Sequence, residues 1–167
     1  MEYEGILSRV EWSEWVVPVP KQNGHVRICG DFKVTINPVL YAEEYPLPRI
    51  EDIFASLAGG MKFSVIDLAQ AYHQMELKED SRKYLTFNTQ KRIYQYHRLV
   101  FSIKSAPSIW QRATDQVLQG LEGPQCYLDD IIVTGSSEDE HLKNLEHVLQ
   151  ILKQFGLRAN RAKFTFF

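Results

Sequence analysis

Two adjacent aspartates lie between two short apolar runs in the stretch Gln125–Val133, and this pattern restricts the fold more than any other in the chain. The runs on either side of Asp129 and Asp130 are β-prone and about as long as strands, which predicts a β-hairpin with the Asp-Asp pair at its tip. Aspartate is a common turn residue, so a purely structural role is one interpretation. However, tight hairpin turns favour Asn-Gly or Asp-Gly, because they need positive φ, and neighbouring carboxylates repel each other. A cation would relieve that repulsion, and hard divalent metals prefer carboxylate oxygen.

A third carboxylate lies near the end of another short apolar run, Phe63–Leu68, at Asp67. An acid at the end of a buried strand can simply be a helix N-cap. If this strand pairs with the Asp129–Asp130 hairpin, however, three carboxylates meet. Three acids at one place are tolerable only around cations, which is the arrangement that two-metal phosphoryl transfer requires, with ions roughly 3.5–4 Å apart.

The length and composition indicate a soluble globular chain. Its 167 residues suit one domain or two small lobes with a shared core, and 44% hydrophobic with 24% charged residues is ordinary. The net charge of −2 excludes a generic polyanion binder. From Lys78 to Arg112, however, eight basic and two acidic residues give +6, which leaves −8 for the rest. A basic segment between acidic clusters suits a protein that holds a nucleic-acid backbone near a metal site, and a solvated surface is the alternative.

Several other classes of protein are disfavoured. Cys29 and Cys126 lack paired spacing, which favours buried free thiols in a reducing compartment, and no histidine stands at zinc-site spacing from them. The first residues resemble no signal peptide, and no apolar run is long enough to span a bilayer. We therefore expect an intracellular protein that is neither secreted nor in a membrane.

Periodicity and turn signals predict an α+β fold, with helices covering one face of a mainly antiparallel sheet. Residues 1–14 are expected to form a short helix or an irregular lead-in. Strands are expected at Trp15–Pro20 (an edge strand), 26–29, 63–68, 84–87 and 93–96, with an Asn-Gly hairpin turn at 21–24. Helices are expected at 48–57, 107–119 and from Ser137 to Phe155, the last opened by a capping box with Glu140. Their apolar faces should be core: Ile50, Ile53, Phe54 and Leu57; Trp110, Ala113, Val117 and Leu121; Leu142, Leu145, Leu149, Leu152 and Phe155.

Four motifs, in order, resemble those of reverse transcriptases, most closely the gypsy-like LTR retrotransposon type. They are Arg27–Lys33 (a fingers motif), Phe63–Gln74 (the first catalytic motif), Phe101–Pro107 (the motif before the palm helix) and Tyr127–Asp130 (the second catalytic motif). The resemblance implies a right-hand polymerase palm with a partial fingers subdomain. Fingers would cover about 1–60 and 70–100, and palm about 61–69 and 101–167. It also implies an RNA-directed DNA polymerase, with a primed RNA or DNA template and dNTPs as partners.

The resemblance also assigns residues to roles. Asp67 and Asp129 would ligate two Mg²⁺ ions, for which Mn²⁺ can substitute, with Asp130 as the third catalytic carboxylate and Leu68 in the metal site. Tyr72 would be the sugar gate that excludes a ribose 2′-hydroxyl, with core packing as the alternative. The nucleotide site would be completed by the following residues: Lys21, Arg27, Leu68, Ala69, Gln70, Ala71 and Phe101. For Lys21 and Arg27 the alternative is ordinary surface charge.

Three departures from the family pattern stand out. The chain has Val100-Phe101-Ser102 where Pro-Phe-Gly or Pro-Gln-Gly is common, so Ser102 places a Cβ where glycine supplies positive φ or close approach. The stretch Trp15–Pro20 is about two residues shorter than usual. Primer grip, thumb and RNase H are expected beyond the chain, in a longer polyprotein. The alternative function is a catalytically inactive remnant, or a domesticated nucleic-acid-binding module that keeps the palm fold.

Overall fold

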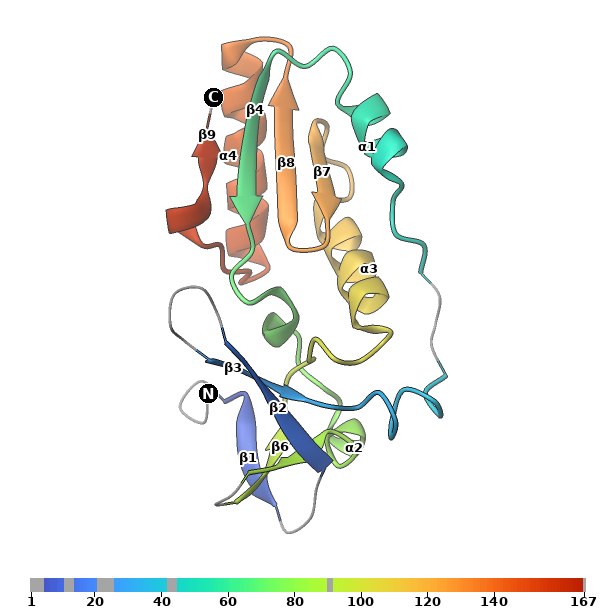
Figure 1. Cartoon of the computed structure of the whole chain (residues 1–167). Coiled ribbons are helices and arrows are strands. Elements are labelled where there is room, and N and C mark those ends of the chain that lie inside the picture. Colours follow the sequence, from blue (N-terminus) through green and yellow to red (C-terminus); the bar gives the residue numbers. More distant parts are fainter. Residues whose placement is uncertain (1–4, 11–13, 21–25, 42–44, 90–91, 167) are drawn as a thin grey trace. The chain divides into compact units, whose positions relative to one another are not determined.

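The computed structural model describes residues 5–10, 14–20, 26–41, 45–89 and 92–166, and these form two compact units. The first unit contains Met1–Glu43 and Tyr72–Ala106, and the second contains Glu44–Ala71 and Pro107–Phe167. Each unit has its own sheet (Figure 1). The predicted α+β class is therefore confirmed, whereas the division into fingers and palm stays a prediction.

The first unit is built on a five-stranded sheet in the order β1-β6-β5-β2-β3. Its strands are β1 (Leu7–Val10), β2 (Glu14–Pro20), β3 (Val26–Gly30), β5 (Thr86–Asn88) and β6 (Ile93–Tyr96). All neighbours pair antiparallel except β2 and β5. A short 3₁₀ turn η1 (Ala71–Gln74) and the helix α2 (Glu79–Arg82) precede β5. Phe87 packs on Tyr96 with 4.7 Å between ring centroids, and both rings are buried.

Two predictions for the N-terminal part need correction. The expected helix or irregular lead-in over residues 1–14 is wrong, because Leu7–Val10 pairs with β6 and β2 already begins at Glu14. β2 is also not an edge strand, since it lies between β5 and β3. It pairs with β5 only at Glu14 and Trp15, however, so at Pro18 and Pro20 the strand β2 pairs with β3 alone. The missing backbone N–H of these prolines is therefore not needed for hydrogen bonds to a second neighbouring strand. The predicted β2–β3 hairpin is confirmed, and its turn at 21–24 lies outside the described residues.

The second unit is built on a four-stranded antiparallel sheet in the order β7-β8-β4-β9. Its strands are β4 (Lys62–Asp67), β7 (Pro124–Tyr127), β8 (Asp130–Gly135) and β9 (Thr165–Phe166). The helices are α1 (Ile50–Ser56), α3 (Ala106–Leu118) and α4 (Glu138–Gln154), with a 3₁₀ turn η2 (Arg161–Lys163) before β9. α4 runs along one face of the sheet behind β4 and β8 (Figure 1).

The ends of α4 follow the predicted signals. The Ser137 hydroxyl accepts the backbone N–H of Glu140 at 3.2 Å, as expected for an N-cap. The Glu140 carboxylate, however, accepts from Ser136 rather than from the cap residue itself, with 2.9 Å to the Ser136 backbone nitrogen. At the other end Gly156 adopts φ +69°, a conformation that glycine reaches without steric cost. The predicted helix limits are therefore confirmed.

The predicted apolar faces of the helices are only partly core. In α1, Ile50 and Phe54 are exposed, and only Ile53 and Leu57 are buried. In α3 the buried face holds Trp110, Gln111, Thr114 and Leu118, while Ala113, Val117 and Leu121 are half-buried. In α4 the buried residues are His141, Val148 and Leu152, whereas Leu142, Leu149 and Phe155 are exposed.

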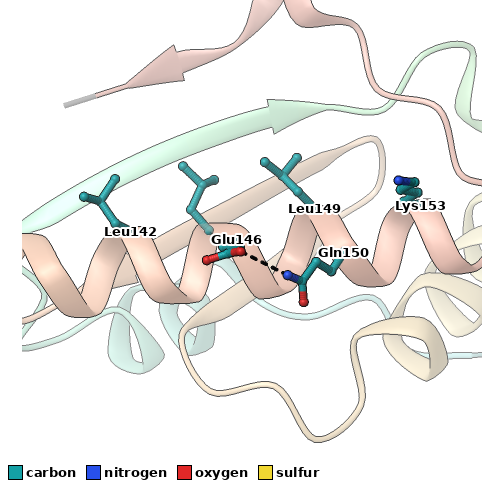
Figure 2. Close-up of a pocket in the computed structure, with 6 residues that line it drawn as sticks. Leu142, Glu146, Leu149, Gln150 and Lys153 are labelled. Atoms are coloured by element: carbon teal, nitrogen blue, oxygen red, sulfur yellow. Dashed lines mark hydrogen bonds between the residues drawn. The ribbon is translucent and has the colours of Figure 1, made fainter.

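Three leucines of α4 line a shallow pocket. Leu142, Leu145 and Leu149 form its apolar wall, and Glu146, Gln150 and Lys153 form its polar side (Figure 2). The Gln150 amide donates to the Glu146 carboxylate at 3.1 Å, one helical turn away. In the part of the chain that the structure describes, no helix is long and apolar enough to cross a membrane.

Candidate active site

The strand β4 pairs with β8 so that Asp67 lies directly opposite Asp130. Directly opposed residues of an antiparallel pair project from the same face of the sheet, with Cα atoms about 4.5–5.5 Å apart. Beyond this pair, the Leu68 N–H donates to the carbonyl of Asp129 at 2.7 Å. The end of β4 and the β7–β8 turn therefore meet at one end of the sheet (Figure 1), as the predicted strand pairing required. Asp67 is 9% exposed, whereas Asp129 and Asp130 face solvent.

The tip of the hairpin is not the predicted Asp-Asp pair. Tyr127 pairs with Asp130, so the two turn residues are Leu128 and Asp129, and Asp130 is the first residue of β8. Leu128 supplies the positive φ that the turn needs, at +55°. That conformation costs an L-residue roughly 1–2 kcal/mol, because Cβ approaches the following carbonyl oxygen. The turn is therefore strained at the residue next to Asp129.

Two side chains of α3 hold the backbone of Leu128. The Trp110 indole Nε1 donates to the Leu128 carbonyl at 2.7 Å, and the Leu128 N–H donates to Gln111 Oε1 at 2.9 Å. Gln111 is fully buried, and its Nε2 donates to the Cys126 carbonyl at 2.8 Å and to Asp115 Oδ1 at 2.9 Å. Apolar periodicity predicts Trp110 in the core and gives no signal for Gln111, because it does not count a buried amide.

The other edge of β4 brings a lysine to Asp67. The Ala69 N–H donates to the Arg158 carbonyl and the Asn160 N–H to the Asp67 carbonyl, each at 2.8 Å. The 3₁₀ turn η2 follows, and it places Lys163 Nζ 2.6 Å from Asp67 Oδ2. No local sequence signal points to Lys163, because it lies 96 residues after Asp67.

The charges of this cluster act on the ionisation of Asp130 and of Lys163. Partial burial raises the pKa of Asp130, and the charges of Asp129 and Asp67 raise it further while Lys163 opposes them. The hydrogen bond to Asp67 raises the pKa of Lys163, to which the charges of all three aspartates also contribute. The site therefore concentrates negative charge, and one ammonium group partly neutralises it.

The donor atoms suit a hard divalent cation. Asp67, Asp129 and Asp130 offer carboxylate oxygens, the ligands that Mg²⁺ and Mn²⁺ prefer. Within the described ranges, no three His, Cys, Asp or Glu side chains are arranged so that they could hold a metal ion together. Asp67 Oδ2 instead faces the Lys163 ammonium. Ligation through Oδ2 of Asp67 therefore requires that Lys163 give up this oxygen.

The residues that follow Asp67 can contact a ligand mainly through their backbone atoms. The side chains of Leu68 and Ala71 are buried at 1% and 2% exposure, so no ligand reaches them. Ala69 is half-buried, and Gln70 is exposed with φ +51°. Among the described non-glycine residues, positive φ occurs only at Gln70 and Leu128, one in each aspartate-bearing segment. Strained backbone of this kind is common at functional sites.

In the first unit, Tyr72 stacks on Phe101 at a tilt, with ring centroids 4.6 Å apart. Tyr72 is 7% exposed and Phe101 is 37% exposed, so Phe101 is the more accessible ring. Ser102 does not take positive φ, so its Cβ carries no backbone strain there, and its carbonyl accepts from the Asn37 amide at 2.9 Å. Arg27 lies in β3.

Two predicted site residues cannot be placed in full. The side chain of Arg27 and the whole of Lys21 lie outside the described residues. Their assignment to the nucleotide site stays a prediction. Cys126 is a buried free thiol, as predicted, and burial raises its pKa to about 12.

Comparison with known proteins gives a consistent result. The family model described as reverse transcriptase (RNA-dependent DNA polymerase) matches residues 19–167. The retrovirus-related Pol polyprotein from transposon opus of Drosophila melanogaster is 39% identical over 91% of this chain, and that from transposon 412 of the same organism is 40% identical over 84%. A foamy viral protease-reverse transcriptase in complex with double-stranded DNA has a similar fold, with a TM-score of 0.91 over 99% of this chain at 23% identity.

These relatives are much longer than the chain. It spans 16% of the opus polyprotein, 12% of the 412 polyprotein and 29% of the foamy viral chain. The comparisons therefore concern one part of larger proteins.

Proposed function

Because the chain belongs to the reverse transcriptase (RNA-dependent DNA polymerase) family, we propose that it is the fingers and palm part of an RNA-directed DNA polymerase from a gypsy-like retroelement. Its reaction would join a dNTP to a primer 3′-hydroxyl, with a primed RNA or DNA strand as template. The observation that carries the proposal is the β4–β8 register, in which Asp67 faces Asp130 and Leu68 is bonded to Asp129.

The carboxylates take distinct parts in this proposal. Asp67 and Asp129 bind two divalent cations, with Leu68 contributing to the site, and Asp130 supports them as the third acid. When bound, such ions lower the pKa of an attacking hydroxyl and neutralise phosphate charge. The raised pKa of Asp130 fits a supporting role, because its environment already disfavours a third negative charge there.

Lys163 acts as the counter-ion of Asp67 in this scheme. Its Nζ lies 2.6 Å from Asp67 Oδ2, so it neutralises the least exposed of the three carboxylates. If Asp67 held a cation through that oxygen, the Lys163 ammonium would remain beside the site. It would then be available to an anionic group of the substrate, such as a triphosphate oxygen.

The residues proposed to bind the nucleotide are Leu68, Ala69, Gln70, Ala71, Tyr72 and Phe101, as the resemblance implies. The proposal keeps Tyr72 as the sugar gate. Its support is the contact between the Tyr72 and Phe101 rings, which are tilted by 47° with centroids 4.6 Å apart and of which Phe101 is the more accessible. A ribose 2′-hydroxyl against such a ring would lack a hydrogen-bond partner.

Primer extension tests the proposal directly. The chain is incubated with a DNA primer on an RNA template, dNTPs and Mg²⁺ or Mn²⁺, beside Asp129→Asn and the control Asp139→Asn, which changes an exposed acid of α4. We expect metal-dependent extension that Asp129→Asn lowers about 10³-fold, because a lost metal ligand removes several kcal/mol of transition-state stabilisation. Asp139→Asn should retain activity. Extension that Asp129→Asn leaves unchanged would refute the catalytic assignment, and template binding without any extension would favour the non-catalytic alternative.

A further inference from the structure

Both backbone polar groups of Leu128 are bound by side chains of α3. Its carbonyl accepts from Trp110 Nε1, and its N–H donates to Gln111 Oε1. Trp110 and Gln111 are adjacent in the sequence and nearly or fully buried. Side-chain partners on both groups of one turn residue replace the hydrogen bonds that a regular turn would leave to water.

The conformation of Leu128 explains why such partners are needed. A two-residue turn with positive φ at its first central position favours glycine there, and this chain has leucine at φ +55°. Nothing in the intrinsic preference of leucine supports that geometry. The bonds from α3 are made to the turn in this conformation, and they therefore stabilise the strained form.

Gln111 is itself held in one orientation. Its Nε2 donates both to the Cys126 carbonyl and to Asp115 Oδ1, which leaves Oε1 directed at the Leu128 N–H. Asp115 is held in turn by the Tyr45 hydroxyl, which donates to Oδ2 at 2.8 Å. A continuous hydrogen-bonded chain thus runs from Tyr45 through Asp115 and Gln111 to the turn.

We propose that Trp110 and Gln111 are positioning residues that lock the β7–β8 turn and thereby set Asp129 and Asp130 against Asp67. The turn is joined to β4 by the Leu68–Asp129 bond. We therefore expect a change in the backbone conformation of Leu128 to move both acids relative to the end of β4. The functional consequence rests on the proposed function, because it takes these carboxylates as metal ligands. The restraint of the turn by these two hydrogen bonds, called the lock below, does not rest on the proposed function, and it is measured separately.

Amide hydrogen exchange measures the lock without any activity. Gln111→Met removes the acceptor of the Leu128 N–H at similar side-chain length, and we expect the Leu128 amide to exchange about tenfold faster or more. The matched control is Thr114→Val, which removes a buried hydroxyl that donates to the Trp110 and Gln111 carbonyls and accepts from Cys126 Sγ but makes no bond to Leu128. Equal Leu128 exchange rates in Gln111→Met and Thr114→Val would overturn the lock.

Mn²⁺ binding measures what the lock does for the acids. Trp110→Phe keeps an aromatic ring but loses the N–H. It should weaken Mn²⁺ binding about threefold to tenfold, which is the effect expected from the loss of one hydrogen bond. Thr114→Val should leave the affinity unchanged. Trp110→Phe also serves if Gln111→Met fails to fold.

Leu128→Gly separates positioning from general stability. Glycine takes positive φ without steric cost, so the turn needs its partners less. The double variant Trp110→Phe/Leu128→Gly should therefore lose less affinity for Mn²⁺ than the product of the two single losses. Losses that multiply would overturn the positioning role. If wild type binds no Mn²⁺, the proposed function fails, and the exchange rates still decide the lock.

Discussion

Lys163 and Asp67 are 96 residues apart in the sequence and form an ion pair with 2.6 Å between Nζ and Oδ2. The pair places a positive charge within the field of all three aspartates, as the raised pKa of Lys163 reflects. A divalent cation that binds Asp67 therefore competes with a charge that the protein itself supplies.

Lys163→Met should tighten Mn²⁺ binding several-fold, because it removes that competing charge.

In EDTA, Lys163→Met should also lower the free energy of unfolding by about 0.2–1 kcal/mol, the range for a partly exposed ion pair. Because pairing raises the pKa of Lys163, this stability is present below pH 10.5 and is lost only as the pH rises through the folded-state pKa. Calorimetric titration and denaturant unfolding measure the two effects. Lys153→Met, which changes an exposed lysine in the last turn of α4, is the control. Unchanged Mn²⁺ affinity in Lys163→Met would contradict the competition.

Asp130→Asn should stabilise the fold at pH 7 in EDTA. The folded state raises the pKa of Asp130 through burial and the charges of Asp129 and Asp67, so the ionised form is disfavoured on folding. Stability from this group is therefore lost as the pH rises from the unfolded value of 3.8 through the folded value, and neutral Asn avoids that loss. The gain should be small because the site is partly solvated, and it should vanish near pH 3. Thermal unfolding at both pH values gives the result, and a gain of the same size at pH 3 would exclude the charge explanation.

Cys126 should be unreactive in the native protein and should cause an alkaline loss of stability. Burial raises its pKa to about 12 from 9.0, so between these values the unfolded state loses a proton that the folded state keeps. Stability should then fall with rising pH by at most about 1.4 kcal/mol per pH unit, the slope for one proton. Cys126→Ala should remove that slope. Iodoacetamide labelling at pH 8 followed by peptide mapping tests the reactivity, and rapid native labelling of Cys126 would contradict its burial.

Tyr72→Ala should increase the incorporation of rNTPs relative to dNTPs, if the ring excludes the 2′-hydroxyl. An unpaired buried hydroxyl costs about 1–3 kcal/mol, which corresponds to a discrimination of about fivefold to 150-fold. Tyr72→Phe keeps the aromatic face and should keep the discrimination. Competition assays with paired nucleotides measure the ratio. A variant that only loses stability, with its rNTP ratio unchanged, would identify Tyr72 as a core residue.

The sequence predicted the centre of the second unit because the signals there are local. Two β-prone runs carry the aspartates at their ends, and antiparallel pairing of such runs brings the ends together. The exact tip of the hairpin was missed by one residue, since turn preferences favour glycine at positive φ and gave no reason to expect Leu128 there. That geometry depends on Trp110 and Gln111, which belong to another element.

The remaining errors arise from buried polar groups and from long-range contacts. In α4 the buried position is occupied by His141, whose Nε2 lies 2.8 Å from the Ser64 hydroxyl on β4. Apolar periodicity assigned that place to Leu142, which is exposed. Lys163 reaches Asp67 only because residues 158–160 pair with the end of β4. No local pattern encodes that contact.

The central claim is that Asp67 and Asp129 jointly bind divalent cations, and Mn²⁺ titration followed by electron paramagnetic resonance tests it most directly. Wild type, Asp67→Asn, Asp129→Asn and the exposed-acid control Asp139→Asn are compared at one pH and ionic strength. We predict that either active-site substitution weakens Mn²⁺ binding about tenfold or more, because each removes a carboxylate ligand, and that Asp139→Asn binds as wild type does. Equal affinities in all four proteins would contradict the claim.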